Sequence, residues 1–402
     1  MNLASLALAY ARRRPLATFL NVLLLAVGVA TITLVILVSS ELEGRMQREA
    51  AGIDLVVGAK GSPLQIVLAG VYHADVPPGN IPLAAVEELA RDPRVREVIP
   101  MAMGDSFRGF RIVGTVPAFV AHYAARLHAG GLWAAPLEAV LGSETAQRTG
   151  LAVGSSFAGS HGLAEGGGEH GDRAYRVVGV LAPTGTVIDR LVLTGMDSVW
   201  AVHDAHGHAE PHDEDADAAP PAREVTLALV KYRSPVAAAS LPRAINSRTV
   251  LQAAAPAYES ARLFSVFGVG TEVVRGFALL LVAASGLGLF VALTQALDER
   301  RLDLAIMRTL GASRGRIVGV LLLESAGLVA LALVCGLALA HGVAATLGDW
   351  LPAAAPLAAG AARWRAEEGW VVLLALAVGI IAAALPAWRA YRLDVAATLA
   401  ES

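Results

Sequence analysis

Four long stretches of the sequence contain almost no charged residue, and this feature constrains the fold more than any other. They cover residues 16–38, 277–297, 317–340 and 370–386, and the third contains one charged residue, Glu324. Each is near the roughly 20 residues that a helix needs to cross about 30 Å of hydrocarbon. Because the chain is also 55% apolar and only 17% charged, an ordinary soluble enzyme is excluded. We predict four transmembrane helices.

Most of the remaining residues form one continuous segment, residues 39–276, between the first and second predicted spans. Polar helical patterns at 41–50 and 253–275 predict a stalk of two helices. Between them, helices are predicted at 82–91 and 142–149. Short β-branched runs predict strands at 53–58, 95–99, 111–116, 175–181, 191–193 and 225–230. The predicted fold class is therefore a membrane protein with a large α+β domain on a helical stalk.

Arginines near the predicted spans indicate the orientation of the chain. They gather in residues 1–15, in the link at 298–316 and in the tail at 387–402, whereas the link at 341–369 has only Arg363 and Arg365. By the positive-inside rule, both termini and the 298–316 link are cytoplasmic, and the large domain and the 341–369 loop lie outside. Residues 1–15 are expected to form an amphipathic helix on the inner leaflet. The first apolar run is too long for a signal peptide, the minority alternative, so we expect an uncleaved anchor.

Several other functions are excluded or made less favourable by composition. The net charge of −3 offers no basic field for nucleic acid. A single cysteine, Cys335, excludes an intrachain disulfide and a cysteine-based metal cluster. The sequence has no G-x-x-x-x-G-K-[ST] loop, so it cannot hold ATP phosphates by that route. We also find no convincing constellation for hydrolysis, so no catalytic residue is predicted.

The link between the second and third spans carries the pattern DERRLDLAIMRTL at residues 298–310. It predicts a short amphipathic helix that ends at Gly311, because glycine tolerates the left-handed backbone conformation. Such a helix on the cytoplasmic side suits docking into a partner's groove, although it can also be a plain interfacial connection. The residues expected on one face are Leu302, Ala305, Ile306 and Leu310.

The longer string ERRLDLAIMRTLGASRGRI resembles the coupling-helix signature of the MacB/FtsX-like permeases, the four-span subunits of type VII ABC transporters. It departs mildly from that signature at Asp303 and Ala305. The opening ALAYARRRPLATFLNVLLLAVGVA, the ending ALPAWRAYRLDVAATL and two segments of the large domain also resemble the family. The matching positions in the string are Glu299, Arg300, Leu304, Met307, Arg308, Leu310, Gly311, Ala312 and Ser313. The resemblance covers nearly the whole chain apart from two histidine-bearing loops.

The resemblance implies a non-catalytic permease subunit in a bacterial inner membrane. It implies a homodimer that binds two copies of a cytoplasmic ATPase and an extracytoplasmic partner of unknown identity. ATP would act through the ATPase, whose closure would move the outer domains, a mechanism called mechanotransmission. The residues expected to contact or position the ATPase are Glu299, Arg300, Leu302, Ile306, Arg308, Leu310 and Gly311.

Glu324 is the only charged residue within the four apolar stretches. An intramembrane carboxylate is by default a candidate proton or ion site. The alternative, which we favour, is that it lies near the inner surface and pairs with an arginine such as Arg316 or Arg12.

Two low-complexity loops, residues 160–173 and 203–221, contain histidines close to acidic residues. Imidazoles beside carboxylates suit Zn²⁺, but the spacing matches no rigid zinc motif. Weak zinc binding and a plain acidic linker therefore both stay open. The candidate ligands are His203, His206, His208 and His212, with His161 and His170 as a possible second group.

Three further alternatives stay open at this stage. The chain can be a membrane-anchored metal-binding or scaffold protein without an ATPase, or an FtsX-like regulator of a periplasmic hydrolase. It can also be an importer with a path through its spans, which the scarcity of polar residues in them disfavours. Within the leading hypothesis, the process served can be efflux, lipoprotein trafficking or metal handling.

Overall fold

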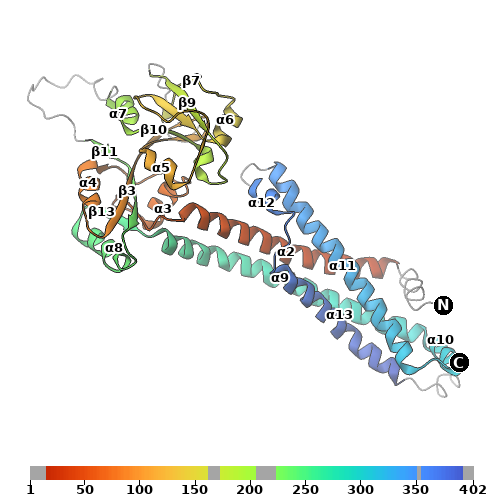
Figure 1. Cartoon of the computed structure of the whole chain (residues 1–402). Helices are drawn as coiled ribbons and strands as arrows, with labels where there is room; N and C mark the ends of the chain where they lie inside the picture. The colour runs from red at the N-terminus through yellow and green to blue at the C-terminus, as the bar shows by residue number, and fades with distance from the viewer. Residues whose placement is uncertain (1–14, 162–172, 205–222, 351–354, 393–402) are drawn as a thin grey trace, which may run out of the picture. The chain divides into compact units, whose positions relative to one another are not determined.

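The computed structural model describes residues 15–161, 173–204, 223–350 and 355–392 (Figure 1). Contacts within the chain divide it into two units. Unit 1 comprises residues 1–43 and 265–402, and unit 2 comprises residues 44–264. Two helices, α2 (Pro15–Ala50) and α9 (Pro256–Glu299), continue from one unit into the other.

Unit 1 is built from long apolar helices. In the described part of the chain, four helices are long and apolar enough to cross a membrane: α2, α9, α11 (Arg314–Trp350) and α13 (Glu368–Tyr391). The described part of unit 1 also contains the short helices α10 (Arg301–Thr309) and α12 (Ala355–Gly360). Each long helix contains one of the four apolar stretches found in the sequence and extends beyond it.

Small residues let the helices of unit 1 approach closely. A Cβ atom added at Gly336 of α11 would lie 2.7 Å from the carbonyl oxygen of Ala26 on α2, so a side chain there would force these two helices apart. Close approach through small residues is the usual way in which membrane helices pack, because lipid gives them little hydrophobic driving force to associate. The buried side chains of this contact region include Val29, Val282 and Val329.

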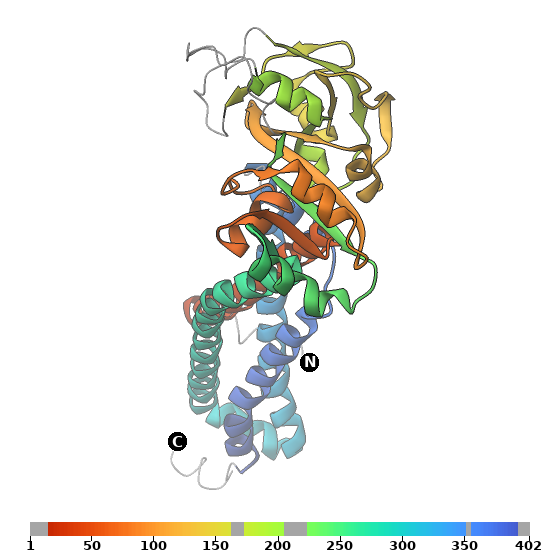
Figure 2. The same ribbon diagram turned by 90° about the vertical axis from the view of Figure 1, so that its left-hand side faces the viewer.

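Unit 2 is an α+β domain with one large mixed sheet, as the sequence predicts (Figures 1 and 2). The order of its main strands is β13-β1-β12-β3-β4-β10-β6-β9-β5, while β11 and β2 form a separate pair. Most pairs are antiparallel, but β4 with β10 and β6 with β9 are parallel. The strands are β1 (Leu55–Ala59), β2 (Ile81–Pro82), β3 (Val95–Phe107), β4 (Phe110–Thr115), β5 (Leu127–Gly130), β6 (Glu138–Leu141), β7 (Ser156–Phe157), β8 (Ser160–His161), β9 (Tyr175–Leu181), β10 (Leu191–Gly195), β11 (Glu224–Val225), β12 (Leu227–Tyr232) and β13 (Leu251–Ala254).

Helices pack against the sheet of unit 2 and bury its apolar side chains. One cluster joins Val57 and Val230 of the sheet to Val86 of α4 and Leu241 of α8. A second cluster joins Val56 and Leu229 to residues of α3 and α5. The helices are α3 (Pro63–Gly70), α4 (Leu83–Ala90), α5 (Pro117–His122), α6 (Ser143–Thr149), α7 (Met196–Asp204), α8 (Ala237–Arg248) and the 3₁₀ helix η1 (Val187–Arg190).

Two boundaries differ from the sequence prediction. The second stalk helix begins at Pro256 and not at residue 253, because Leu251–Ala254 pair with β1 as strand β13. The segment 341–369, predicted as a loop, contains the last turns of α11 and the helix α12. The predicted helix at residues 1–15 and the end of the tail lie almost wholly outside the described residues.

Candidate functional site

A sharp turn at Arg300 separates α9 from α10. The backbone amide of Arg300 donates to the carbonyl of Leu297 at 3.2 Å, and that of Leu304 donates to the carbonyl of Arg300 at 2.9 Å. The sequence predicted one helix over residues 298–310, so this break corrects that prediction. Asp298 and Glu299 therefore belong to the end of α9, and α10 is an independent short helix.

Helix α10 has a buried face and an exposed apolar face. Leu304 and Ala305 are 6% and 0% exposed, and the Leu304 cluster includes Ile317 of α11 and Ala390 of α13. Ala305 therefore does not share the exposed face, contrary to the sequence prediction. The exposed apolar face consists of Leu302, Ile306 and Leu310, which are 42%, 44% and 82% exposed. Spacing of four residues places these three side chains along one side of the helix.

The end of α10 confirms the prediction that Gly311 terminates this helix. Its φ angle is +95°, a conformation that favours glycine. Its amide donates to the Arg308 carbonyl at 3.1 Å, and the next amide, of Ala312, donates to the Met307 carbonyl at 2.9 Å. Arg308 lies in the last turn, and its Nη1 is buried without a hydrogen-bond partner among the described residues.

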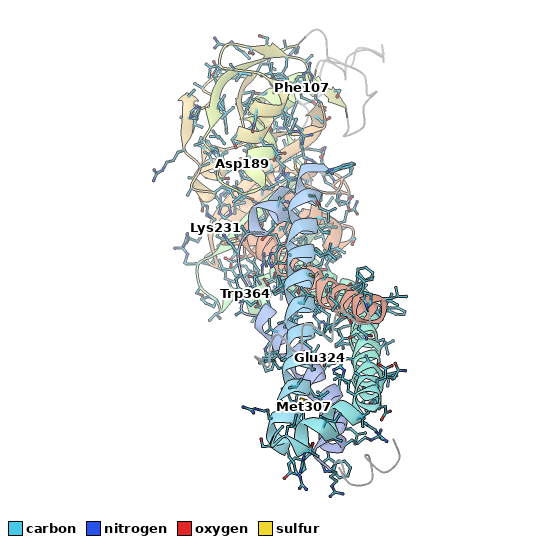
Figure 3. All side chains as sticks on the ribbon, turned by 90° about the vertical axis from the view of Figure 1, so that its right-hand side faces the viewer. Phe107, Asp189, Lys231, Met307, Glu324 and Trp364 are labelled. Atoms are coloured by element: carbon cyan, nitrogen blue, oxygen red, sulfur yellow. The ribbon has the colours of Figure 1, made fainter. Side chains whose placement is uncertain are left out.

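Glu324 pairs with Arg300 across the turn. Nη1 of Arg300 donates to Oε2 of Glu324 at 3.1 Å, and the two side chains are 12% and 7% exposed. Figure 3 shows Glu324 on α11 at the same end of unit 1 as Met307 of α10. The sequence predicts an arginine partner for Glu324, such as Arg316 or Arg12. The structure pairs it with Arg300 instead, and Arg12 lies outside the described residues. Arg300, predicted to contact the ATPase, is thus largely buried against α11.

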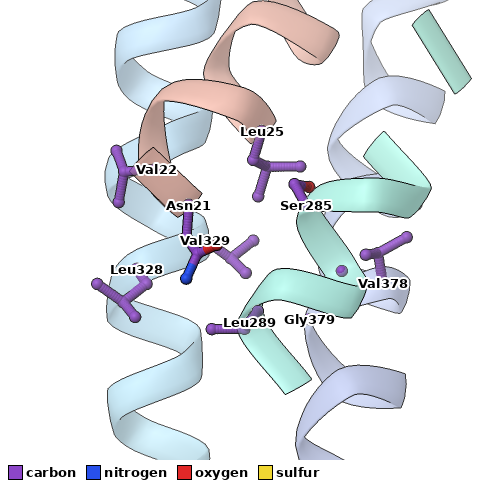
Figure 4. A pocket seen from close by; sticks show the side chains of 10 residues that line it. Asn21, Val22, Leu25, Ser285, Leu289, Leu328, Val329, Val378 and Gly379 are labelled. Atoms are coloured by element: carbon purple, nitrogen blue, oxygen red, sulfur yellow. The ribbon is translucent and has the colours of Figure 1, made fainter. Parts of the chain in front are cut away.

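One small cavity lies among the long helices of unit 1 (Figure 4). It lies between α2, α9, α11 and α13 and has a volume of about 10 Å³, with Asn21 and Ser285 as its polar lining residues. A volume of this order holds about one water molecule. This cavity is therefore far too small for a cargo molecule.

The predicted zinc ligands fall mostly outside the described residues. His203 lies in the last turn of α7, while His206, His208, His212 and His170 are not described. His161 is in strand β8. Among the described residues, no group of three or more histidine, cysteine or acidic side chains is placed to hold a metal ion. Zinc binding by the loop at 203–221 stays a prediction.

The fold defines a class of protein: a membrane protein that carries an extramembrane α+β domain between its first two apolar helices. Two family models match this division. The model of the MacB-like periplasmic core domain matches residues 18–248, and that of the FtsX-like permease C-terminal matches residues 275–395. The chain belongs to the MacB/FtsX-like permeases of ABC transporters. These are permease components and are generally non-catalytic, and the MacB-like domain is periplasmic.

One similar protein is the uncharacterized ABC transporter permease YknZ of Bacillus subtilis (strain 168). The two are 26% identical over 140 residues, which is 34% of this chain and 32% of YknZ. The match therefore spans about a third of that relative's length.

Two solved structures also match. The periplasmic region of MacB from Actinobacillus actinomycetemcomitans has a TM-score of 0.35 and 14% identity, covering 56% of this chain and 97% of that one. The extracellular domain of YknZ from Gram-positive bacteria has a TM-score of 0.31 and 12% identity, covering 50% and 98%.

Proposed function

We propose that this chain is the four-span permease subunit of an ABC complex in which a separate ATPase drives motion of the periplasmic domain. The observation that carries the proposal is the exposed apolar face of α10. A helix whose other side is packed against α11 and α13 keeps Leu302, Ile306 and Leu310 exposed. Exposed apolar side chains at helical spacing are the pattern that inserts into a protein groove.

The topology follows from the same arrangement. Arginines are concentrated in the link that contains α10 and beside both termini, so we place this link and the termini in the cytoplasm. We also propose that the membrane is the bacterial inner membrane, because the family's core domain is periplasmic. The periplasmic domain then lies on the opposite side. We assign the contact between two copies of the chain to helix α9, because 28% of its most apolar stretch is buried, against 39% for α13 and 44% for α2 and α11. Two copies of the chain would then engage two copies of the ATPase.

The force pathway begins at the turn between α9 and α10. A push on α10 acts directly on α9, and the Arg300–Glu324 pair passes part of it to α11. Helices α2 and α9 continue without a break into unit 2. Because an α-helix is hydrogen-bonded along its whole length, it transmits displacement along its axis better than a loop does.

The helix ends are fastened within unit 2. The hydroxyl of Tyr72, just after α3, contacts Ser260 Oγ of α9 at 2.6 Å and donates to the Met46 carbonyl of α2 at 3.5 Å. Oε2 of Glu49, near the end of α2, accepts from the amide of Val187 in η1 at 2.7 Å. These bonds join both helices to different parts of the domain, so movement of the helices would reach the sheet.

The test is a charge placed at the most exposed residue of the proposed docking face. We expect Leu310→Asp to leave the protein in the membrane but to abolish co-purification with its co-expressed ATPase, since loss of a large apolar anchor costs about 2 kcal/mol or more. Thr309→Asp is the matched control, because Thr309 is also exposed but lies outside the apolar face. Equal loss in both variants, or intact co-purification of Leu310→Asp, would contradict the proposal.

A second candidate function is zinc binding by the loop at 203–221. It is favoured by four histidines within ten positions, surrounded by acidic residues. Titration calorimetry of the full chain with Zn²⁺ tests it. An affinity that is unchanged when His203, His206, His208 and His212 are all replaced by alanine would remove it. A zinc-loaded chain that binds no ATPase would instead support the metal-binding scaffold.

A further inference from the structure

A second buried polar cluster lies near the other end of α11. His341 is 24% exposed, and its two ring nitrogens contact different segments. Nδ1 lies against the carbonyl oxygen of Ala361, just after α12, and Nε2 lies 3.0 Å from Oε2 of Glu368, the first residue of α13. Glu368 itself is fully buried. One imidazole ring thus bridges three segments of unit 1.

The chemistry of these two contacts fixes the number of protons. A carbonyl oxygen only accepts, so Nδ1 of His341 must carry a hydrogen and donate it to Ala361. A carboxylate also only accepts. The contact between Nε2 and Oε2 therefore needs one proton: either His341 is an imidazolium that donates to a carboxylate, or Glu368 is protonated and donates to a neutral ring.

The surrounding groups favour the charged pair. Oε1 of Glu368 accepts from the backbone amide of Arg365 at 3.0 Å, and its position in the first turn of α13 stabilises negative charge. Arg365 in turn donates from Nη2 to Oε2 of Glu41 on α2 at 3.1 Å. The other charged residues of this linker, Arg363 and Glu367, are exposed.

We infer that His341 and Glu368 form a binding site for one proton, which holds α11 against α12 and α13 when it is occupied. Loss of that proton leaves two acceptor atoms facing each other at hydrogen-bond distance, so the contact becomes repulsive. Packing at this end of unit 1 therefore responds to pH, and on the topology proposed above the pH that it senses is that of the periplasm.

The inference does not depend on the ATPase, because it concerns only packing within unit 1. It can therefore be tested on the full chain in lipid nanodiscs. The informative variant is Glu368→Gln. The amide of glutamine can donate to a neutral ring at Nε2 while its carbonyl oxygen accepts from the amide of Arg365. This variant should keep the contact at every pH and need no proton.

Thermal unfolding measured from pH 5 to pH 8.5 distinguishes the outcomes. We expect the wild-type melting temperature to fall by about 3 °C or more over this range relative to Glu368→Gln. The exchange of backbone amides in residues 361–370 should also be faster in the wild type than in Glu368→Gln at pH 8.5. Glu367→Gln, which alters the exposed neighbouring carboxylate, should behave as the wild type does.

A second variant covers the case in which Glu368→Gln fails to fold. His341→Asn removes the ring, so its melting temperature should lack the fall with rising pH that distinguishes the wild type from Glu368→Gln. An identical pH dependence in the wild type and in either site variant would overturn the inference. So would a Glu367→Gln variant that loses the pH dependence to the same extent.

Discussion

The two ends of α11 are held by ion pairs of similar geometry but different chemistry. At one end, Arg300 lies 3.1 Å from Glu324; at the other, His341 lies 3.0 Å from Glu368. All four side chains are mostly or fully buried. A guanidinium always keeps its protons, whereas the contact of an imidazole with a carboxylate depends on one proton that can be lost. One helix can therefore be held by a permanent ion pair nearer its start and by a proton-dependent contact nearer its end.

The largest expected effect comes from breaking the permanent pair. Glu324→Ala leaves the guanidinium of Arg300 buried without this carboxylate, which typically costs about 3 kcal/mol of unfolding free energy. The loss should be the same from pH 5 to pH 8.5, unlike the pH-dependent loss expected at His341. Thermal unfolding of the full chain across this range measures both.

The double variant Arg300→Met with Glu324→Leu is the matched control for that prediction. A well-packed apolar pair often replaces a buried ion pair with little cost. We therefore expect the double variant to recover most of the stability lost in Glu324→Ala. A double variant as unstable as the single one would mean that Arg300 and Glu324 act separately.

A histidine in unit 2 extends the comparison, because its effect on stability changes with pH in the opposite direction. Both ring nitrogens of His73 are buried without a hydrogen-bond partner in the described part of the chain. Burial, together with the charges of Arg111 and Arg190, lowers the pKa of His73 to about 3. Below pH 6.5 the unfolded chain therefore takes up a proton that the folded domain excludes, so stability is lost as pH falls. The contact between His341 and Glu368, in contrast, predicts that stability is lost as pH rises.

His73→Asn tests this difference, since asparagine tolerates the left-handed backbone of this position, where φ is +51°. At pH 5 the buried ring costs about 2 kcal/mol relative to neutral pH. The variant should therefore lose less stability than the wild type between pH 7.5 and pH 5, as measured by urea unfolding. The control is His128→Asn, because His128 is exposed. Equal acid sensitivity in all three proteins would refute the prediction.

The sequence predicted the elements of the fold better than the partners of its buried charges. Strand β9 has the predicted bounds, and β1, β4 and β10 are close to theirs, because β-branched runs mark them directly. Strands β5 and β6 were missed, since LHAG and EAVL carry no such run. Local patterns identify local structure and say little about contacts between distant segments.

The charge pairs show why these contacts were harder to predict. The sequence predicts an arginine near the inner surface, such as Arg316, as the partner of Glu324, but eight residues along a helix separate two side chains by about 12 Å. Arg300 reaches Glu324 only because the chain turns there, and neither proline nor glycine marks that turn. His341 and Glu368 were missed because the segment between them was treated as one loop. The signal available in the sequence was a histidine directly after the apolar run 317–340 and a glutamate just before the apolar run 370–386.

The smallest expected effect comes from an ion pair that lies near Arg300 but is exposed. Asp298 and Arg301 are 3.1 Å apart, with 55% and 57% of their side chains exposed. Exposed pairs of this kind contribute about 0–1 kcal/mol, because water screens the charges and both side chains lose freedom. Asp298→Asn should therefore shift the melting temperature by about 2 °C at most. A shift as large as that of Glu324→Ala would show that position beside the turn, and not burial of the pair, determines how strongly a charge holds this end of α11.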